Sequence, residues 1–332
     1  MIKSYPYRLD GFMDWLYEQK SGAESALLSD DTAIIAKNRQ KLKTMLGIDK
    51  LEAIAVRSEP ELVSTDVIEG LTIRSMAMEI LPKLTMPFYV VEPEKSKGKS
   101  VLYCHGHGAG GLLDCFDRKD PPAYHKYIPL TLAKRGYTVY AFEPVGFGEL
   151  VIENFQLTEG IYTVSPCYPI STILMMHGIT LNGLRVYEAM RVADYIEGKG
   201  EIFATTGISG GGLLAATYAA LDDRVAAAAV SCYTCMYRDC LMAMRHCVCN
   251  FLPGNLDLGE MPHVMALMLP KPLFISAGER DPLFPVEGVR KATKIIREIY
   301  AKHAPDASVE LEVFEGEHEY SEAFIDWLDE VL

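Results

Sequence analysis

The sequence predicts an α/β protein with a mostly parallel central sheet and helices on both faces. Short apolar runs alternate with longer amphipathic stretches over most of the 332 residues. This alternation indicates parallel pairing, because parallel neighbours need a crossover connection, which a helix usually supplies. Hydrophobic residues make up 49% of the chain, which is enough for the large core of such a fold.

The first part of the chain is predicted to be helical. Residues 12–17 and 32–46 are rich in apolar and helix-favouring residues, and the helical character runs to about residue 60. We therefore divide the chain into an N-terminal helical extension, residues 1–69, and a main domain, residues 70–332. The extension contains no residues that suggest chemistry.

The main domain contains the alternating elements. Apolar runs predict strands at 71–80, 86–91, 100–104, 137–142, 201–205, 225–230, 273–277 and 309–314. Helical periodicity predicts helices at 129–134, 171–197, 213–221, 289–301 and 321–331. Residues 231–269 interrupt the pattern after the sixth of these strands, so they are predicted to form an insertion over the active end of the sheet.

Charge and composition narrow the partners. The formal net charge of -13 argues against a nucleic acid or an anionic membrane as partner, since both need clustered Lys and Arg. No stretch resembles a membrane span, and residues 1–15 lack the apolar core of a secretory signal. We expect a cytoplasmic protein whose eight cysteines are reduced. A homo-oligomer remains open.

The most informative motif is the pentapeptide at residues 207–211, Gly-Ile-Ser-Gly-Gly, which has the pattern G-x-S-x-G. It lies between a predicted strand and a predicted helix, which is the context of a nucleophile elbow. In such a turn the flanking glycines permit close backbone approach, and the serine hydroxyl projects above the sheet. The alternative is an ordinary glycine-rich turn with an inert serine. We predict that Ser209 is a nucleophile.

A serine nucleophile needs a base to take its proton and an acid to orient that base. Asp281 follows the strand at 273–277, and His318 follows the strand at 309–314, in the order that this arrangement requires. We predict Asp281 as the acid and His318 as the base, with Glu279 as the alternative acid.

Acyl transfer also needs donors for the oxyanion. The backbone N–H groups of Gly210 and His107 are predicted to supply them, the latter from the segment His-Gly-His-Gly-Ala-Gly-Gly at 105–111. The imidazoles of His105 and His107 could instead brace this turn or bind a metal. No carboxylate lies nearby at helical ligand spacing, so no metal is predicted here.

These motifs resemble the α/β-hydrolase superfamily, in particular its dienelactone-hydrolase-like and acetyl-xylan-esterase-like bacterial branch. The similarity covers about residues 70–332 and includes Gly136-Tyr137, Gly146-Phe147-Gly148 and the segment PLFISAGERDPLFP. Two departures stand out. Ser209 replaces the cysteine of true dienelactone hydrolases, and Gly210 replaces a bulkier residue, which is predicted to widen the acyl side.

The resemblance implies an α/β-hydrolase fold and a serine hydrolase of carboxylic esters that works through an acyl-enzyme without a cofactor. The implied substrate is a small-molecule ester, such as an acetyl ester of a carbohydrate or a similar alcohol. A thioesterase or a peptidase of the same fold is the alternative within enzymes. A non-catalytic binding protein that kept the fold is the alternative outside them.

The insertion is unusual for its cysteines, Cys232, Cys235, Cys240, Cys247 and Cys249. A metal site is one reading, but the spacing fits no familiar pattern, and buried free cysteine behaves as a small hydrophobe. We therefore predict no metal. The insertion is expected to wall the substrate pocket, with Tyr233, Met236, Met242 and Met244 as candidate contacts and core packing as their alternative role. Phe147, outside the insertion, is a further candidate pocket residue.

Overall fold

The computed structural model describes residues 9–19, 26–108, 110–116, 123–153 and 165–332. Its centre is a nine-stranded sheet with the strand order β1-β2-β3-β5-β4-β6-β7-β8-β9. The strands are β1 (Glu61–Ile68), β2 (Leu71–Leu81), β3 (Leu84–Glu92), β4 (Lys99–Cys104), β5 (Thr138–Phe142), β6 (Ile202–Ile208), β7 (Val225–Ser231), β8 (Leu273–Gly278) and β9 (Val309–Phe314).

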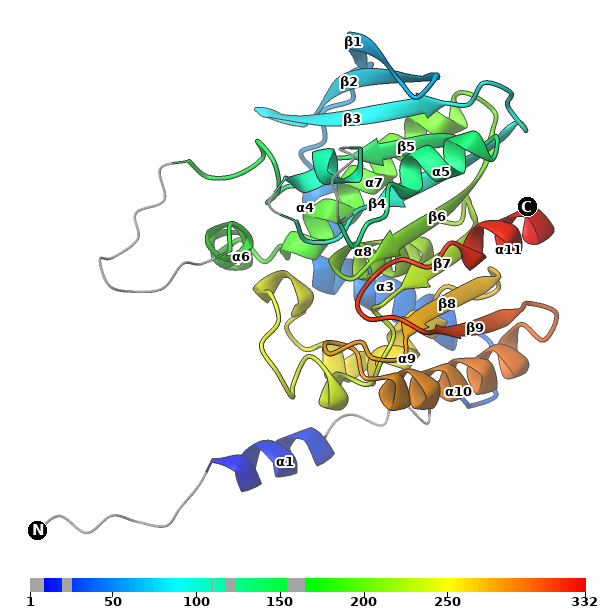
Figure 1. Cartoon of the computed structure of the whole chain (residues 1–332). Helices are drawn as coiled ribbons and strands as arrows, with labels where there is room; N and C mark the ends of the chain where they lie inside the picture. The colour runs from blue at the N-terminus through cyan, green and yellow to red at the C-terminus, as the bar shows by residue number, and fades with distance from the viewer. Residues whose placement is uncertain (1–8, 20–25, 109, 117–122, 154–164) are drawn as a thin grey trace, which may run out of the picture.

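The sheet has two parts with different pairing. β1, β2 and β3 are antiparallel to one another, and β3 also pairs antiparallel with β5. The six strands from β4 to β9 pair in parallel, through crossovers that contain helices (Figure 1). The prediction of a mostly parallel sheet is therefore confirmed, and so is the position of all eight predicted strands, to within a few residues.

Helices cover both faces of the sheet. α5 (Ile128–Lys134) and α11 (Ala323–Val331) contribute to one buried apolar cluster. The other face is covered by α3 (Ile34–Leu46), α7 (Leu181–Glu197), α8 (Gly210–Leu221), α9 (Met261–Ala266) and α10 (Val286–His303).

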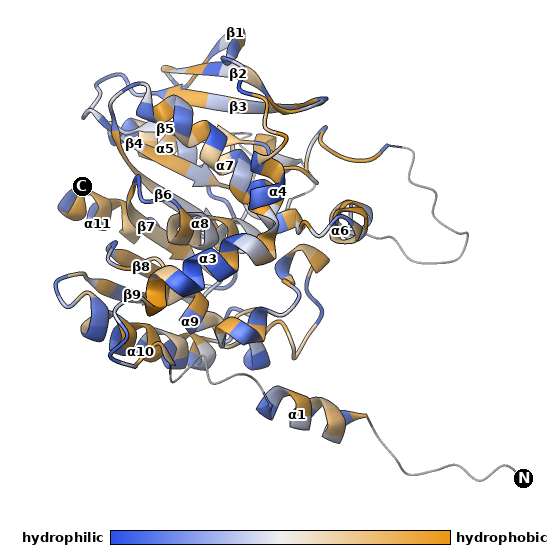
Figure 2. Cartoon of the chain, turned by 180° about the vertical axis from the view of Figure 1, so that it is seen from behind, coloured by the Kyte–Doolittle hydropathy of each residue, from blue (hydrophilic) through white to orange (hydrophobic). Residues whose placement is uncertain are grey.

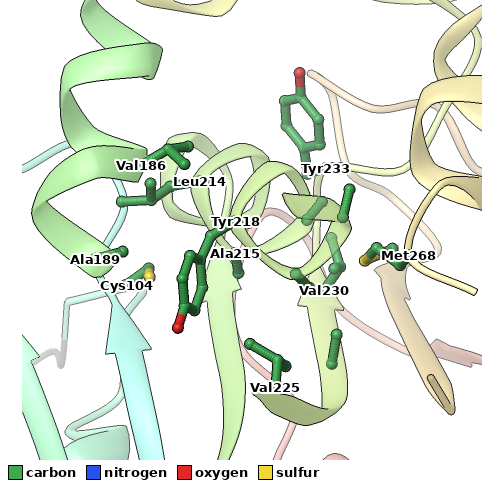
Figure 3. Packing of buried hydrophobic residues seen from close by; sticks show 14 of the residues in the cluster. Cys104, Val186, Ala189, Leu214, Ala215, Tyr218, Val225, Val230, Tyr233 and Met268 are labelled. Carbon is green, nitrogen blue, oxygen red and sulfur yellow. The ribbon is translucent and has the colours of Figure 1, made fainter. Parts of the chain in front are cut away.

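β4 shows how the sequence supports this layering. Successive side chains of a strand point to opposite faces, so Val101 and Tyr103 join the α5 side whereas Leu102 and Cys104 join the α8 side. Figure 3 shows Cys104 beside Tyr218 of α8 in this second cluster. Both faces of β4 are buried, which explains its continuous apolar run.

The N-terminal extension is shorter than predicted. Its described helices are α1 (Asp10–Glu18), α3 and the short α4 (Ile48–Glu52), and residues 1–8 lie outside the described part. α1 lies apart from the sheet (Figures 1 and 2) and contacts the segment 231–269, where the Tyr17 hydroxyl donates to Glu260 at 2.6 Å and Arg238 pairs with Asp14 at 2.8 Å. Several of its apolar side chains are exposed. Residues 61–68, placed in the extension by the sequence, form strand β1 instead. The burial pattern explains the error, because β1 is exposed almost throughout and lacks a buried apolar face.

The predicted helix at 171–197 is wrong as a single element. The structure has two helices there, α6 (Cys167–Met176) and α7. Gly178 separates them with a φ of +67°, a value that glycine adopts without strain. Thr180 then caps α7 by accepting a hydrogen bond from the Gly183 N–H.

The insertion at 231–269 connects β7 to β8. It consists of short turns, η2 (Tyr237–Asp239), η3 (Val248–Asn250) and η4 (Asn255–Leu258), followed by α9. The buried carboxylate of Glu260 organises it by accepting hydrogen bonds from the N–H groups of Arg238 (3.3 Å) and Met261 (3.0 Å). Because β1 precedes the predicted strands, the insertion follows the seventh strand of the sheet.

None of the described helices is long and apolar enough to cross a bilayer.

Candidate active site

Ser209 stands at the junction of β6 and α8 in a strained conformation. Its φ of +56° and ψ of -123° lie where residues with a Cβ rarely occur. Such a backbone costs about 1–3 kcal/mol and persists only where the surroundings impose it. The turn is fixed at one end by the Ser209 N–H, which donates to the Ser231 carbonyl at 3.0 Å. The half-buried hydroxyl is placed at the N-terminus of α8.

The flanking glycines are needed because the backbone segments touch. A Cβ at Gly207 would lie 2.1 Å from the carbonyl oxygen of Gly211. A Cβ at Gly211 would lie 2.1 Å from the carbonyl oxygen of Cys104, at the end of β4. Both distances are far below any van der Waals contact, so the motif owes its glycines to close packing of α8 on β4 and β6.

Asp281, which is buried, and His318, which is half-buried, form a pair in the two loops that follow β8 and β9. The Asp281 Oδ2 lies 2.8 Å from the His318 Nδ1, and the Asp281 Oδ1 accepts the N–H of Leu283 at 2.8 Å. A second N–H, that of Phe284, reaches the same oxygen at 3.1 Å. The carboxylate is therefore fixed by the backbone, and it fixes the imidazole in turn. Glu279 is exposed on the surface beside it.

Strand topology places Ser209 and this pair at the same edge. β6, β8 and β9 are parallel, so the loops after them all leave from the carboxyl end of the sheet. Within the described residues, the Ser209 hydroxyl makes no hydrogen bond to His318. Catalytic hydrogen bonds are often long in the absence of substrate and shorten in the complex.

Two aromatic rings surround the His318 imidazole. The Phe284 ring is stacked on it with a centroid distance of 5.8 Å and an angle of 17°. The Tyr124 ring lies 5.6 Å away on centroids. Sequence reasoning missed Tyr124, because it lies just before α5 and belongs to no motif. Its hydroxyl donates to the His107 carbonyl at 2.6 Å, which links the base to the loop after β4.

His105 braces that loop. Its Nδ1 lies 2.7 Å from the Gly106 carbonyl oxygen, which can only accept, so Nδ1 carries a proton. The Nε2 lies 2.9 Å from Glu143, whose second oxygen accepts the Leu112 N–H at 2.9 Å. The Gly106 carbonyl and the His107 N–H belong to one peptide group. The hydrogen bonds that run from Glu143 through His105 to the Gly106 carbonyl therefore fix the orientation of the His107 N–H. This N–H is the one that the sequence predicts as an oxyanion donor.

The His107 imidazole fills the space beside Gly210. A Cβ at Gly210 would lie 2.6 Å from the His107 Cε1 and 2.7 Å from its Nδ1. The prediction that Gly210 widens the acyl side is therefore wrong, because the imidazole occupies the volume that a larger residue would take. Gly210 is the first residue of α8, and its N–H has no acceptor within the helix.

Three of the predicted pocket residues have different positions. The Phe147 ring lies 5.2 Å from the His107 ring and 4.9 Å from the His105 ring, so it borders the loop after β4. Tyr233 is buried, and its ring lies 5.4 Å from Phe284. Met236 is half-buried at the start of η2, and within the described residues no hydrogen bond joins it to Asp281 or His318.

The insertion has a cavity of its own. An apolar cavity of about 240 Å³ is lined by Tyr237, Leu241, Met242, Asn250, Phe251, Leu252, Gly254, Asn255 and Leu256. Neither Ser209 nor His318 belongs to this lining. The cavity is therefore separate from the three residues predicted to act together.

One buried histidine near the site has an unusual protonation behaviour. His125 follows Tyr124 and is fully buried, and its ring lies 6.2 Å from that of His105. Burial, together with the neighbouring His105, lowers the pKa of His125 to about 3. This histidine is neutral at physiological pH, and it supports the loop as an uncharged ring.

The chain is similar in sequence to one curated protein. No protein-family model matches the chain. The "Putative hydrolase YtaP" of Bacillus subtilis (strain 168) is 26% identical over 230 residues, which cover 65% of this chain and 72% of that protein. The relationship therefore spans most of both chains.

Solved structures share the fold. "Methylesterase BT1017" matches with a TM-score of 0.68 and 20% identity, over 99% of this chain and 69% of that one. A "putative acetyl xylan esterase (BF1801)" from Bacteroides fragilis NCTC 9343 matches with a TM-score of 0.70 and 16% identity, over 94% and 82% of the two chains. The strand order and these matches agree, and they show that the chain has the α/β-hydrolase fold.

Proposed function

We propose that this protein is a serine hydrolase of carboxylic esters that works through an acyl-enzyme, with Ser209 as nucleophile, His318 as base and Asp281 as orienting acid. The observation that carries the proposal is the strained turn at Ser209. A φ of +56° on a residue with a Cβ is costly, and it is expected to persist where it serves a function. The Asp281–His318 pair at the same edge of the sheet supplies the base.

The first half-reaction forms the acyl-enzyme. The Ser209 Oγ attacks the ester carbonyl carbon while the His318 Nε2 takes the hydroxyl proton. The negative charge moves to the former carbonyl oxygen, and the N–H groups of Gly210 and His107 stabilise it. His318 then gives its proton to the leaving alkoxide, which departs as the alcohol.

The second half-reaction returns the enzyme. A water molecule gives a proton to His318 and attacks the acyl carbon, and the acid product leaves as His318 reprotonates Ser209. Asp281 keeps the His318 Nδ1 protonated throughout, so the Nε2 faces the reacting atoms, and it stabilises the imidazolium that forms in each half.

The surroundings of Gly210 favour a small acyl group. The His107 imidazole fills the space at Gly210, and Phe147 packs against that imidazole. Both narrow the volume beside the proposed oxyanion site. An acetyl ester of a carbohydrate or another alcohol suits this space, in line with the names of the two structural relatives, a methylesterase and an acetyl xylan esterase.

The test is labelling with a fluorophosphonate, followed by peptide mapping. We expect one adduct on Ser209 in the wild type and none in Ser209→Ala, with both proteins folded by circular dichroism. Hydrolysis of p-nitrophenyl esters from acetyl to octanoyl then measures the acyl preference, which should be highest for acetyl. Comparison with an acetyl thioester separates an esterase from a thioesterase.

Two results would contradict the proposal. Esterase activity that survives in Ser209→Ala would exclude Ser209 as the nucleophile. A folded wild type that neither reacts with the probe nor hydrolyses any of these esters would favour a binding protein that kept the fold.

A further inference from the structure

Four potential metal ligands meet beside the loop that follows β4. The His107 imidazole and the thiols of Cys167, Cys247 and Cys249 all lie within 4.8 Å of one another. They come from three separate segments of the chain: the loop after β4, the start of α6, and the insertion near η3. The proposed mechanism uses only the backbone of His107 and none of the three thiols, so the cluster has no role in it.

The distances suit a tetrahedral zinc site. With Zn–S of about 2.3 Å and Zn–N of about 2.0 Å, a sulfur and a nitrogen ligand in a tetrahedron lie about 3.5 Å apart. The His107 Nε2 lies 3.3 Å from the Cys249 Sγ and 3.9 Å from the Cys167 Sγ, on either side of that value. Because all four ligand atoms lie within 4.8 Å of one another, a metal would need only small side-chain adjustments.

The orientation of the imidazole agrees with ligation through Nε2. The His107 Cε1 and Nδ1 face Gly210, at 2.6 and 2.7 Å from a Cβ built there, whereas Nε2 is 3.8 Å away on the side of the thiols. The His107 ring therefore places its Cε1–Nδ1 edge against the proposed oxyanion site, and it directs its Nε2 toward the three sulfurs.

The charges around the cluster also suit a metal with three thiolates. Zinc(II) with three thiolates and one neutral imidazole carries one net negative charge. The Arg185 guanidinium is buried (4% exposed), and its Nη2 lies 3.2 Å from the Cys167 Sγ. Its Nε donates to the Val145 carbonyl at 2.9 Å, so the cation is fixed in place. Metal thiolates usually have such outer partners.

We propose that His107, Cys167, Cys247 and Cys249 bind one zinc ion as a structural site. Four protein ligands fill the tetrahedron and leave no position for a substrate, which is typical of structural rather than catalytic zinc. The ion joins the loop that carries the His107 N–H to α6 and to the insertion. Its function is to fix these three segments relative to one another, at the rim of the proposed active site.

Metal content of the full-length protein tests this directly. Protein purified without chelator is analysed by inductively coupled plasma mass spectrometry, and we expect about one zinc per chain. Cys167→Ser and Cys249→Ser should each lose most of that zinc. Cys240→Ser is the matched control, because Cys240 is a buried cysteine of the same insertion, outside the cluster, and should retain it.

Cobalt(II) gives a spectroscopic test that does not depend on esterase activity. Zinc is removed from the wild type with a chelator, and cobalt(II) alone is then added. We expect tetrahedral ligand-field bands and an intense thiolate-to-cobalt charge-transfer band, saturating at one cobalt per chain. Serine at one ligand position should reduce the charge-transfer intensity by about one third, since one of three thiolates is lost. Zinc added afterwards should abolish the bands.

Several outcomes would overturn the proposal. One is a folded, reduced wild type that contains no zinc and binds neither zinc nor cobalt at this cluster. Another is a zinc content that is unchanged in both Cys167→Ser and Cys249→Ser. A third is a disulfide between two of these cysteines, found by peptide mass mapping of protein prepared under reducing conditions and alkylated before digestion.

Discussion

The Oδ2 of Asp281 and the Nδ1 of His318 lie 2.8 Å apart although 37 residues separate them in the sequence. β8 and β9 are neighbours in the sheet, and each residue lies in the loop directly after its strand. The pair is thus formed by sheet pairing, and two backbone N–H groups fix the carboxylate.

Asp281→Asn tests the role of this carboxylate. The amide can donate to Nδ1, which would move the imidazole proton to Nε2, where a base needs a lone pair. We expect kcat for p-nitrophenyl acetate to fall by about a thousandfold or more, with a small change in KM. Glu279→Gln is the control, because Glu279 is exposed in the same loop, and its kcat should stay within about twofold of wild type. A large loss in Glu279→Gln alone would transfer the role to Glu279.

Ser209→Gly tests the backbone strain. A φ of +56° and ψ of -123° is close to the first central position of a type II′ turn, which glycine favours. Relief of about 1–3 kcal/mol exceeds the entropic cost of glycine, about 0.4–1 kcal/mol. We expect the free energy of unfolding in urea to be about 1 kcal/mol higher for Ser209→Gly than for Ser209→Ala, with both variants inactive. Equal stability would show that the turn is not strained.

Glu143→Gln tests the support of the loop after β4. Glutamine keeps the size of Glu143 but not its charge, so the contact that holds His105 is weakened and the Gly106–His107 peptide gains freedom. Loss of one oxyanion donor typically costs about a hundredfold or more in kcat, so weakening the support of such a donor is expected to cost less. We expect kcat to fall about tenfold at nearly constant KM. Glu149→Gln, at an exposed position, should leave both unchanged.

His125→Phe tests the effect of the buried histidine on stability at low pH. The pKa of His125 is about 3 in the folded protein, against 6.5 for an ordinary histidine, so between these values only the unfolded state binds the proton. The contribution of neutral His125 to the free energy of unfolding is therefore fully present above pH 6.5, and it is lost as the pH falls toward 3.

Protonation of His125 in the unfolded state lowers the free energy of unfolding by about 2 kcal/mol between pH 7 and pH 5. Urea denaturation at the two pH values should show a smaller loss for His125→Phe than for wild type, by about that amount. His177→Gln, at an exposed histidine, should lose as much as wild type. An unchanged pH response in His125→Phe would refute the prediction.

The sequence was most informative where the residues that define a structural element and its chemistry lie next to one another in the chain. The elbow at Ser209 could be predicted because strand, glycines and helix are adjacent in the chain. The strand pattern then restricted the acid and the base to the loops that contain Asp281 and His318. The strand β1 was not predicted, because it packs on one neighbour and has no alternating buried face.

The cluster at His107 could not have been predicted from spacing. Cys167 is 60 residues from His107, and Cys249 is 142 residues from it, with no repeat that relates them. Only the folding of α6 and the insertion onto the loop after β4 brings them together. The sequence prediction considered the cysteines of the insertion as one group, whereas the structure divides them.

The strand order has a consequence for the loop after β9. β7 and β8 lie between β6 and β9, so His318 must cross about 14 Å, three strand spacings, to approach Ser209. The loop is secured by the Tyr320 N–H on the Tyr124 carbonyl (3.0 Å) and by the Lys126–Glu319 ion pair (2.9 Å). The length of this loop therefore matters for the proposed mechanism, because removing one residue would shorten the reach of His318 while leaving the sheet intact.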